Sequence, residues 1–431
     1  MRIAVIGAGI VGVTTAFELA CDGHEVSVFE RRASVAEETS FANAGVVAPG
    51  YVAPWAAPGM PAKVMRNLFS RHAAISLARP SSPGQRAWMW RWWRACSAPT
   101  YAANRERLHR LALYSQQRLR ALNHALKLDH EQSQGYMVLL RTPQDLALAQ
   151  GGLKLLTELG VKHNLLDAAQ ARGVEPGLNA ETALHAAVHL PNEDIGNCRE
   201  FAHLLRFEAQ RQGAVFCFQR TVLSITAGMR PMVAHHATDS PASPREEYFD
   251  AVVVCAALGS AELLKPLGLR LPMAAVHGYS ITAPLRQVEA YPHLGPASAV
   301  MDEKYKVAIS RMGQRVRVAG GAELGGRLER FDEAAIQTLY KVLDDWYPGC
   351  AQLAQVQRWK GARPMLPDGP PVLGASGAPG VWLNLGHGSS GWALACGSAR
   401  VLADQVAGRT PSINTEGLDI GRLKLSRLAA P

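Results

Sequence analysis

The chain has 431 residues, and its 45 Lys+Arg against 36 Asp+Glu give a formal net charge of +9. Hydrophobic residues make up 48% and charged residues 19%, values close to globular averages that exclude a disordered chain. This length is enough for two or three domains, each with a core of its own. The seven scattered cysteines form no CxxC pair, so we expect no disulfide framework and no metal site.

The N-terminal segment has the pattern of a nucleotide-binding βαβ unit. Residues 2–6 (RIAVI) predict a buried parallel strand. A GxGxxG motif follows at residues 7–12 and opens an amphipathic helix that extends to about residue 20. A second strand is predicted at residues 25–29 (EVSVF), directly before Glu30. Strand, glycines, helix, strand and acid in this order form the dinucleotide fingerprint in its required context.

Each part of this motif has a physical role. Gly7 allows the tight turn, Gly9 lets the backbone approach a pyrophosphate, and Gly12 lets helix and strand pack closely. The helix N-terminus then faces the phosphates, and Glu30 accepts the hydroxyls of an adenosine ribose. We expect the unit to bind its nucleotide through Ile6, Gly7, Ala8, Gly9, Ile10, Val11, Gly12, Glu30 and Arg31.

Three further segments place small residues where a predicted element ends. Residues 38–45 are small and polar, the strand predicted over residues 248–255 leads into a small-residue turn, and residues 382–397 have the pattern strand, glycine loop, helix. An enzyme that binds a nicotinamide cofactor needs no third glycine-rich strand end. A flavin enzyme does, because the flavin ring must be held far from its adenosine. The pattern therefore favours FAD. The further residues expected at this cofactor are Ser40, Asn43, Ala44, Gly45, Val222, Ala256, Gly259, Arg363, Gly386, His387, Gly388, Gly391 and Trp392.

Several longer stretches carry a family resemblance. The chain resembles the D-amino-acid dehydrogenase small subunits of the D-amino-acid oxidase-like FAD superfamily. This resemblance implies an FAD enzyme that oxidises a D-amino acid to its imino acid, and so to a 2-oxo acid and ammonia, and passes electrons to a quinone or another respiratory acceptor. The matching stretches are ETSFANAGVVAPGY (38–51), APWAAPG (53–59), LPNEDIGNC (190–198), GYS (278–280), DEKYKVAISR (302–311), WKGARPMLPDGPPVLG (359–374) and LNLGHGSSGWALACGS (383–398).

The departures from what the resemblance leads us to expect are His277, Phe41 and the pair Ser389-Ser390. His277 stands where we expect a lysine before GYS, which leaves the identity of the substrate open. Relatives with covalent flavin use a His near position 41 or a Cys near position 360. Phe41 and Lys360 occupy these positions here, so we predict non-covalent FAD.

The chemistry of amino-acid oxidation indicates which side chains to look for. Flavin supplies the electron chemistry, so the protein must fix the substrate carboxylate and hold Cα in place. A guanidinium matches a carboxylate in bidentate fashion, and Arg363 is the candidate. Tyr279 and Tyr305 are candidates to complete a carboxylate clamp, and each is equally compatible with a packed strand tyrosine. His387 is favoured as a loop residue beside the flavin over a general base.

The fold class expected from these segments is α/β: a Rossmann-type FAD-binding domain with an interleaved α+β substrate domain. Its antiparallel sheet would roof the flavin, with the substrate between sheet and flavin. The FAD-binding domain is predicted to be discontinuous, with segments 1–70, 190–270 and 355–425. The substrate domain is then made of the largely helical segment 71–189 and the strand-rich segment 271–354.

The helical segment also carries the basic charge. Residues 60–127 have a net charge of +12, and the rest of the chain is slightly acidic. They include a long helix predicted over residues 101–127 and four tryptophans within residues 88–93. Two interpretations of the tryptophans stand: a packed core, or contact with an anionic membrane near a membrane quinone. Nucleic acid is not expected, because no binding motif accompanies the charge.

Two alternative functions stay open beside D-amino-acid oxidation. One is an amine oxidoreductase that acts on a secondary amine or an imino acid. The other is a flavoprotein subunit that is active only in a larger complex, and either a homo-oligomer or a hetero-oligomer fits the sequence. No hydrophobic run has the pattern of a transmembrane helix, so we expect a cytoplasmic enzyme that docks at most peripherally on the membrane.

Overall fold

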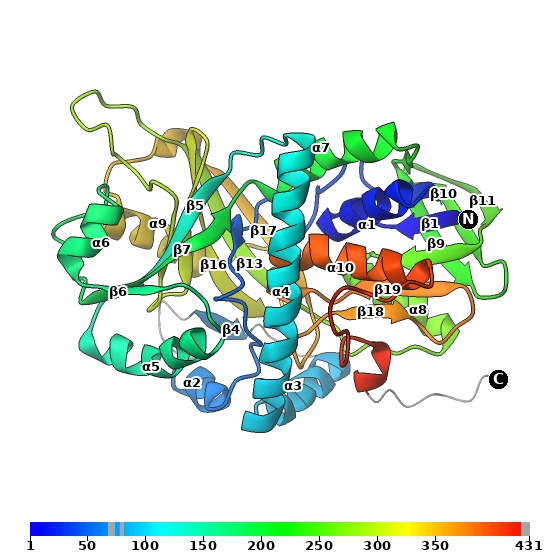
Figure 1. Ribbon diagram of the computed structural model, residues 1–431, viewed down its shortest axis with the longest axis horizontal. Coiled ribbons are helices and arrows are strands. Elements are labelled where there is room, and N and C mark those ends of the chain that lie inside the picture. The colour runs from blue at the N-terminus through cyan, green and yellow to red at the C-terminus, as the bar shows by residue number, and fades with distance from the viewer. Residues whose placement is uncertain (68–73, 78–81, 424–431) are drawn as a thin grey trace.

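The computed structural model describes residues 1–67, 74–77 and 82–423. Figure 1 shows two β-sheets lying side by side, with helix α4 (Ala98–Leu126) running across the molecule between them. The smaller sheet lies with the N-terminal strand, and the larger sheet fills the other half. The two halves correspond to the expected α/β architecture.

The smaller sheet is a doubly wound nucleotide-binding sheet. Its six strands have the order β18-β19-β12-β1-β2-β8, and every pair is parallel except β18 with β19. The predicted strands 2–6 and 25–29 are confirmed as β1 and β2. The bounds are β1 (Arg2–Ile6), β2 (Glu25–Phe29), β8 (Val215–Cys217), β12 (Ala251–Val254), β18 (Val372–Ala375) and β19 (Val381–Leu385).

Each face of this sheet is covered by different elements. Ile3, Val5 and Val253 project into a core shared with α1 (Ile10–Cys21), α4, α7 (Cys198–Arg211) and α10 (Gly391–Val406). The alternate residues project towards a three-stranded antiparallel sheet and α8, as strand geometry requires. These elements are β9 (Arg220–Thr226), β10 (Met232–Ala237), β11 (Ser240–Tyr248) and α8 (Ser260–Leu264).

Two strand predictions in this region need correction. The single strand expected over residues 248–255 is two elements, because β11 ends at Tyr248 and β12 begins at Ala251. The turn between them lets the chain leave the three-stranded sheet and enter the parallel one. The strand expected to begin at Val222 begins at Arg220, so Val222 lies inside β9 and pairs with His235 of β10.

The larger sheet has ten strands and is mixed. Its main path is β17-β13-β16-β15-β14-β5-β7-β3, while β4 pairs with β16 and β6 pairs with β7. The antiparallel sheet that was predicted is present, but β5 joins β14 and β4 joins β16 in parallel. The strands are β3 (Val46–Val47), β4 (Ile75–Leu77), β5 (Ser133–Leu140), β6 (Asn164–Leu166), β7 (Ala186–Ile195), β13 (Ala274–Pro284), β14 (Ala299–Asp302), β15 (Val307–Met312), β16 (Arg315–Leu324) and β17 (Gln357–Met365).

The distribution of strands departs from the expected domain segments. β3 lies in segment 1–70 and β17 lies in segment 355–425, yet both belong to the larger sheet. β7 runs across residue 190, one of the expected boundaries. The chain therefore crosses between the two halves more often than the sequence predicted, and the domain limits remain a prediction.

The long helix predicted within the largely helical segment lies at the junction of the two sheets. The helix expected over residues 101–127 is confirmed as α4, and its buried leucines share a core with α1 and α10. Within the described residues, no helix is both long and apolar enough to cross a bilayer. The other helices are α2 (Met60–Asn67), α3 (Pro83–Ala95), α5 (Pro143–Glu158), α6 (Ala168–Val174) and α9 (Glu333–Trp346).

Candidate active site

The chain adopts the tight turn before α1 that the glycine motif predicted. Gly7 has a φ of +100°, and a Cβ atom placed on Gly12 would lie 1.8 Å from the carbonyl oxygen of Gly7. Only glycine allows this turn and this close approach of helix to strand. Gly9 precedes the helix without a side-chain cap, and the Ile10 amide donates to Oγ of Ser40 at 3.1 Å.

A second helix N-terminus lies beside the first. α1 and α10 follow parallel strands of the same sheet and pack side by side, with Oγ1 of Thr14 donating to the Ala395 carbonyl at 3.3 Å. Neither helix has an acidic residue in its first turn, and neither N-cap residue, Gly9 or Ser390, caps its helix through a side chain. Two positive dipole ends therefore point to one edge of the sheet, which suits a diphosphate.

Glu30 is held in place by the backbone around the glycine turn. Its carboxylate accepts hydrogen bonds from the amides of Ala8 and Arg32, both at 2.8 Å. Burial raises the pKa of this carboxyl above its usual value, and the two amide bonds oppose that shift. Arg31, also expected at the cofactor, instead pairs with Glu38 at 2.7 Å.

The turn at residues 40–45 is tied to the larger sheet. The side-chain oxygen of Asn43 accepts from the Gly45 amide at 2.8 Å, and the Ala44 carbonyl accepts from Oγ of Ser310 at 2.7 Å. Gly45 has a φ of +75°, which favours glycine. Its carbonyl accepts from the Gly196 amide at 2.8 Å. The expected cofactor turn therefore lies between the two sheets.

Arg363 on β17 faces the same region. Nη1 donates to the Gly321 carbonyl at 2.8 Å, and a Cβ atom placed on Gly278 would lie 2.3 Å from Nη2, so the guanidinium lies flat on the Gly278 backbone. Among the described residues, no carboxylate forms an ion pair with Arg363. Burial lowers the pKa of its guanidinium to about 10. The neighbouring Ala362 carbonyl accepts from Oγ1 of Thr39 at 2.7 Å, which links β17 to the cofactor turn.

Arg317 is a second buried guanidinium, and sequence reasoning missed it. Its side chain is only 5% exposed, and burial lowers its pKa to about 10. Nη1 donates to the Asn43 carbonyl at 3.2 Å and Nε donates to Oγ1 of Thr282 at 3.1 Å. The alternating pattern RVRVA at residues 315–319 placed Arg317 on a strand, but nothing in that pattern distinguishes it from the exposed Arg315.

The structure does not bring Tyr279 and Tyr305 to Arg363. Neighbouring residues of a strand point to opposite faces, so Tyr279 points away from the face on which Gly278 carries Arg363. The Tyr279 hydroxyl donates to Glu323 and accepts from the Asp332 amide. Tyr305 packs with the core around α9, its ring 5.2 Å from the Arg141 guanidinium. A clamp of these three side chains does not form, because both tyrosines lie in the α9 core.

His387 is a buried loop residue. Its Nε2 lies 3.0 Å from Oγ of Ser398, and burial lowers its pKa to about 3. The imidazole is therefore neutral at pH 7. The backbone of His387 pairs with Met365, two residues after Arg363, so the glycine loop before α10 lies at the end of β17. The structure therefore places His387 in the loop before α10, and its role beside the flavin remains a prediction.

The other predicted cofactor residues lie in three places. Ile6, Val11, Gly386, Gly388, Gly391 and Trp392 lie in or beside the turns that precede α1 and α10. Ala256 and Gly259 follow β12 in a short 3-10 turn at the same edge of the sheet. Val222 lies in the three-stranded sheet, within its hydrophobic core. Within the described ranges, no group of three or more His, Cys, Asp or Glu side chains is placed to hold a metal ion.

Comparison with known proteins agrees with this geometry. A family model described as "FAD dependent oxidoreductase" matches residues 2–405. The chain belongs to this family. Two relatives named D-amino acid dehydrogenase match nearly end to end. The Rhizorhabdus wittichii protein is 41% identical over 98% of this chain and 100% of its own, and the Agrobacterium fabrum protein is 39% identical over 98% and 99%.

Solved structures show the same fold. Glycine oxidase from Geobacillus kaustophilus superposes with a TM-score of 0.74 at 20% identity over 99% of both chains. L-proline dehydrogenase from P. horikoshii superposes with a TM-score of 0.71 at 17% identity over 99% of both chains. The predicted fold class and the predicted FAD dependence are thus confirmed.

The described residues fit FAD. The paired N-termini of α1 and α10, whose own N-cap residues make no side-chain cap, provide backbone donors for the diphosphate. Glu30 keeps free lone pairs for ribose hydroxyls after accepting two amide bonds. Lys360, at the position where a covalent link would occur, is bonded to Glu323 at 2.7 Å. Non-covalent binding remains a prediction.

Proposed function

We propose that this flavoenzyme oxidises a small D-amino acid to its imino acid, which water then hydrolyses to a 2-oxo acid and ammonia. The two full-length relatives named D-amino acid dehydrogenase support the substrate class. The observation that carries the proposal is Arg363, a partly buried guanidinium near the cofactor turn that has no carboxylate partner among the described residues. An amino acid brings that partner.

The protein's role in this reaction is binding and orientation. When bound, FAD accepts the two electrons and the hydrogen that leave Cα. Arg363 holds the carboxylate by two parallel hydrogen bonds and so fixes Cα relative to the cofactor turn. His387 is buried in the loop before α10, where its Nε2 lies 3.0 Å from Oγ of Ser398, and we assign it a positioning role beside the flavin.

Anaerobic flavin reduction tests the proposal. The purified holoenzyme is mixed with D-alanine, L-alanine or sarcosine in the absence of oxygen, and the absorbance of oxidised flavin is followed. We expect D-alanine to bleach the flavin and L-alanine and sarcosine to leave it oxidised. Bleaching by sarcosine alone would move the assignment to a secondary-amine oxidoreductase. Reduction by none of a panel of D-amino acids would overturn the proposal.

We further propose that the electrons pass to a quinone and that the enzyme docks on anionic lipid through α3. The tryptophan cluster divides between the two earlier interpretations. Trp88 is buried and donates to the Met365 carbonyl at 2.9 Å, which anchors α3. Trp90 and Trp93 are 57% and 54% exposed, with ring centroids 5.0 Å apart. Exposed arginines flank these rings, a combination that suits a lipid headgroup layer: Arg91 and Arg94.

A further inference from the structure

Trp55 lies against Arg363 and also reaches the glycine loop before α10. The centroid of its ring is 5.6 Å from Cζ of Arg363, within the range of a cation–π contact. Its Nε1 donates to Oγ of Ser389 at 3.1 Å. Trp55 and Arg363 are both half-buried, so each keeps part of its surface open to a ligand. The indole therefore joins the candidate carboxylate site to the loop that the sequence predicts beside the flavin.

The proline-rich segment that carries Trp55 is anchored at two points before the ring. The Gly50 amide donates to the Glu193 carboxylate at 3.0 Å. Pro54 packs on Gly369, since a Cβ atom placed on this glycine would lie 3.0 Å from Cβ of Pro54. Proline also limits the backbone freedom of the segment. The indole is thus ordered before a substrate arrives, which reduces the entropy cost of binding against it.

A second half-buried tryptophan lies on the other side of Arg363 along β17. Trp359 projects from the same face of the strand as Arg363, because the two are four positions apart. Its ring lies on Gly361, between the two residues, where an added Cβ atom would be 1.8 Å from the ring. Trp55 packs instead with Met365, which follows Arg363 on the strand. The two tryptophans therefore flank the guanidinium along β17.

The strand positions around Arg363 add apolar side chains on the same face. Val276 pairs with Arg363, and Leu324 pairs with Val276, so all three project from one face of the sheet. The alternate positions of these strands carry polar side chains that project from the opposite face: His277, Glu323 and Lys360. Arg363 thus borders an apolar cluster against which Trp55 packs.

We propose that Trp55 and Trp359 form the walls of the side-chain pocket and restrict the substrate to amino acids with an apolar side chain. This inference rests on the proposed function and adds the class of side chain. With its carboxylate paired to Arg363, the amino acid places its side chain against the indoles, where water is displaced. An apolar side chain gains free energy there, whereas an amide or a charged group loses its hydrogen bonds to water. Both tryptophans are thus specificity-determining residues.

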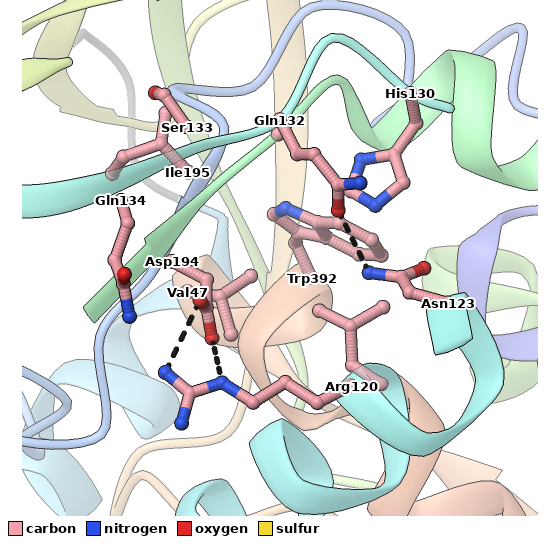
Figure 2. A pocket seen from close by; sticks show the side chains of 12 residues that line it. Val47, Arg120, Asn123, His130, Gln132, Ser133, Gln134, Asp194, Ile195 and Trp392 are labelled. Carbon is pink, nitrogen blue, oxygen red and sulfur yellow. Dashed lines mark hydrogen bonds and ion pairs between the residues drawn. The ribbon is translucent and has the colours of Figure 1, made fainter. Parts of the chain in front are cut away.

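A cavity of about 330 Å³ between α4 and the β5–β7 pair is a rival site for a small molecule. Figure 2 shows that polar groups on its wall are paired with one another. Arg120 pairs with Asp194 at 2.8 Å, and Asn123 donates to Gln132 at 3.0 Å. Because Asp194 already pairs with Arg120, this arginine is less available to a carboxylate than Arg363. A variant at this cavity therefore serves as a control.

Selectivity between D-leucine and D-asparagine tests the inference, because their side chains are nearly equal in size and differ in polarity. The ratio of the two rate constants for anaerobic flavin reduction at limiting substrate is measured with purified holoenzyme. Trp55→Ala and Trp359→Ala each remove one wall, and Trp55→Phe keeps an aromatic ring. Phe207→Ala removes an exposed aromatic ring elsewhere, and Gln134→Trp adds bulk at an exposed position that lines the rival cavity.

We expect the parent to prefer D-leucine roughly tenfold or more. Trp55→Ala and Trp359→Ala should each lower this preference about fivefold, mainly through weaker binding of D-leucine. Trp55→Phe should keep it within about twofold, and both controls should match the parent. Equal reduction by the two amino acids in the parent, or an undiminished preference in both alanine variants, would overturn the inference. Failure of every D-amino acid to reduce the parent flavin would instead refute the proposed function itself.

Discussion

Arg317 is a buried guanidinium and Arg363 a partly buried one, and both lack an ion-pair partner among the described residues. Burial lowers the pKa of each to about 10. Each donates to a backbone carbonyl, Arg363 to Gly321 and Arg317 to Asn43. A cation held in this way is stabilised when an anion arrives beside it. Under the proposed function, the substrate carboxylate would be that anion for Arg363, while Arg317 lies beside the turn at residues 40–45.

A buried carboxyl near the same turn should make stability depend on pH. Glu193 is 4% exposed, and burial raises its pKa from 4.5 to about 7. Between these values the folded state binds more protons than the unfolded state, so stability falls as pH rises from about 4.5 to 7. Glu193→Gln removes this penalty and keeps an oxygen for the Gly50 amide. The variant should therefore gain roughly 2–3 kcal/mol relative to the parent on going from pH 4.5 to pH 8.

Thermal unfolding at several pH values measures this effect. Tm is recorded between pH 4.5 and pH 8 for the parent, for Glu193→Gln and for Glu416→Gln, which changes an exposed glutamate. The Tm advantage of Glu193→Gln should grow with pH, and that of the control should stay flat. A Tm difference that does not vary with pH would show that Glu193 is not the titrating group.

At the scale of elements, the contact between α1 and β1 depends on Gly12. A Cβ atom there would lie 1.8 Å from the Gly7 carbonyl oxygen, so Gly12→Ala must push the helix away from the glycine turn. We expect this variant to be purified without FAD and to unfold at a lower temperature. Gly151→Ala is the matched control, because nothing lies within 4 Å of its added Cβ. In the middle of α5 it should be neutral or stabilising by about 0.5–1 kcal/mol. Normal FAD content in Gly12→Ala would refute this account of the turn.

The prediction of membrane docking concerns the exposed tryptophans of helix α3. The double variant Trp90→Ser/Trp93→Ser removes the two exposed indoles and leaves Trp88 anchored to Met365. We expect it to lose most co-sedimentation with vesicles of anionic lipid at low salt while keeping activity with a soluble dye. The control Leu148→Ser/Met229→Ser removes two exposed apolar side chains elsewhere, at 74% and 92% exposure. Equal sedimentation of both variants with the parent would exclude α3 as the contact.

The structure also refines the meaning of the basic segment. Part of its charge is used inside the molecule, since Arg118 pairs with Glu18 at 2.6 Å and Arg120 with Asp194 at 2.8 Å. These α4 arginines join the helix to α1 and β7. The arginines of α3 that flank the exposed tryptophans lie in solvent instead. The net charge of +9 therefore reflects both packing between elements and one exposed surface.

Across the whole molecule, local patterns predicted the elements well and their long-range assembly less well. The glycine motif fixes its own geometry, so β1, α1, β2 and the role of Gly12 followed from the sequence. Assigning β17 to the larger sheet required knowing its partner β13, which lies about 80 residues away in the chain. The face of the sheet from which Tyr279 projects depends on the register between β13 and β17. The sequence around a strand tyrosine is the same for either face, so the sequence alone did not predict this orientation. Arg317 was missed because the burial of a guanidinium without an ion-pair partner is a property of the assembled fold.

The central claim is that Arg363 holds the carboxylate of a D-amino acid at the cofactor, and one comparison of anaerobic flavin-reduction rates tests it. D-alanine and D-alaninamide, which lacks the carboxylate, are compared at limiting concentration in the parent, in Arg363→Met and in the control Arg286→Met, which changes an exposed arginine. The parent and the control should prefer D-alanine by about 30-fold or more, as a charge-assisted bidentate pair implies. In Arg363→Met that preference should fall close to one. An undiminished preference for D-alanine in Arg363→Met would contradict the account.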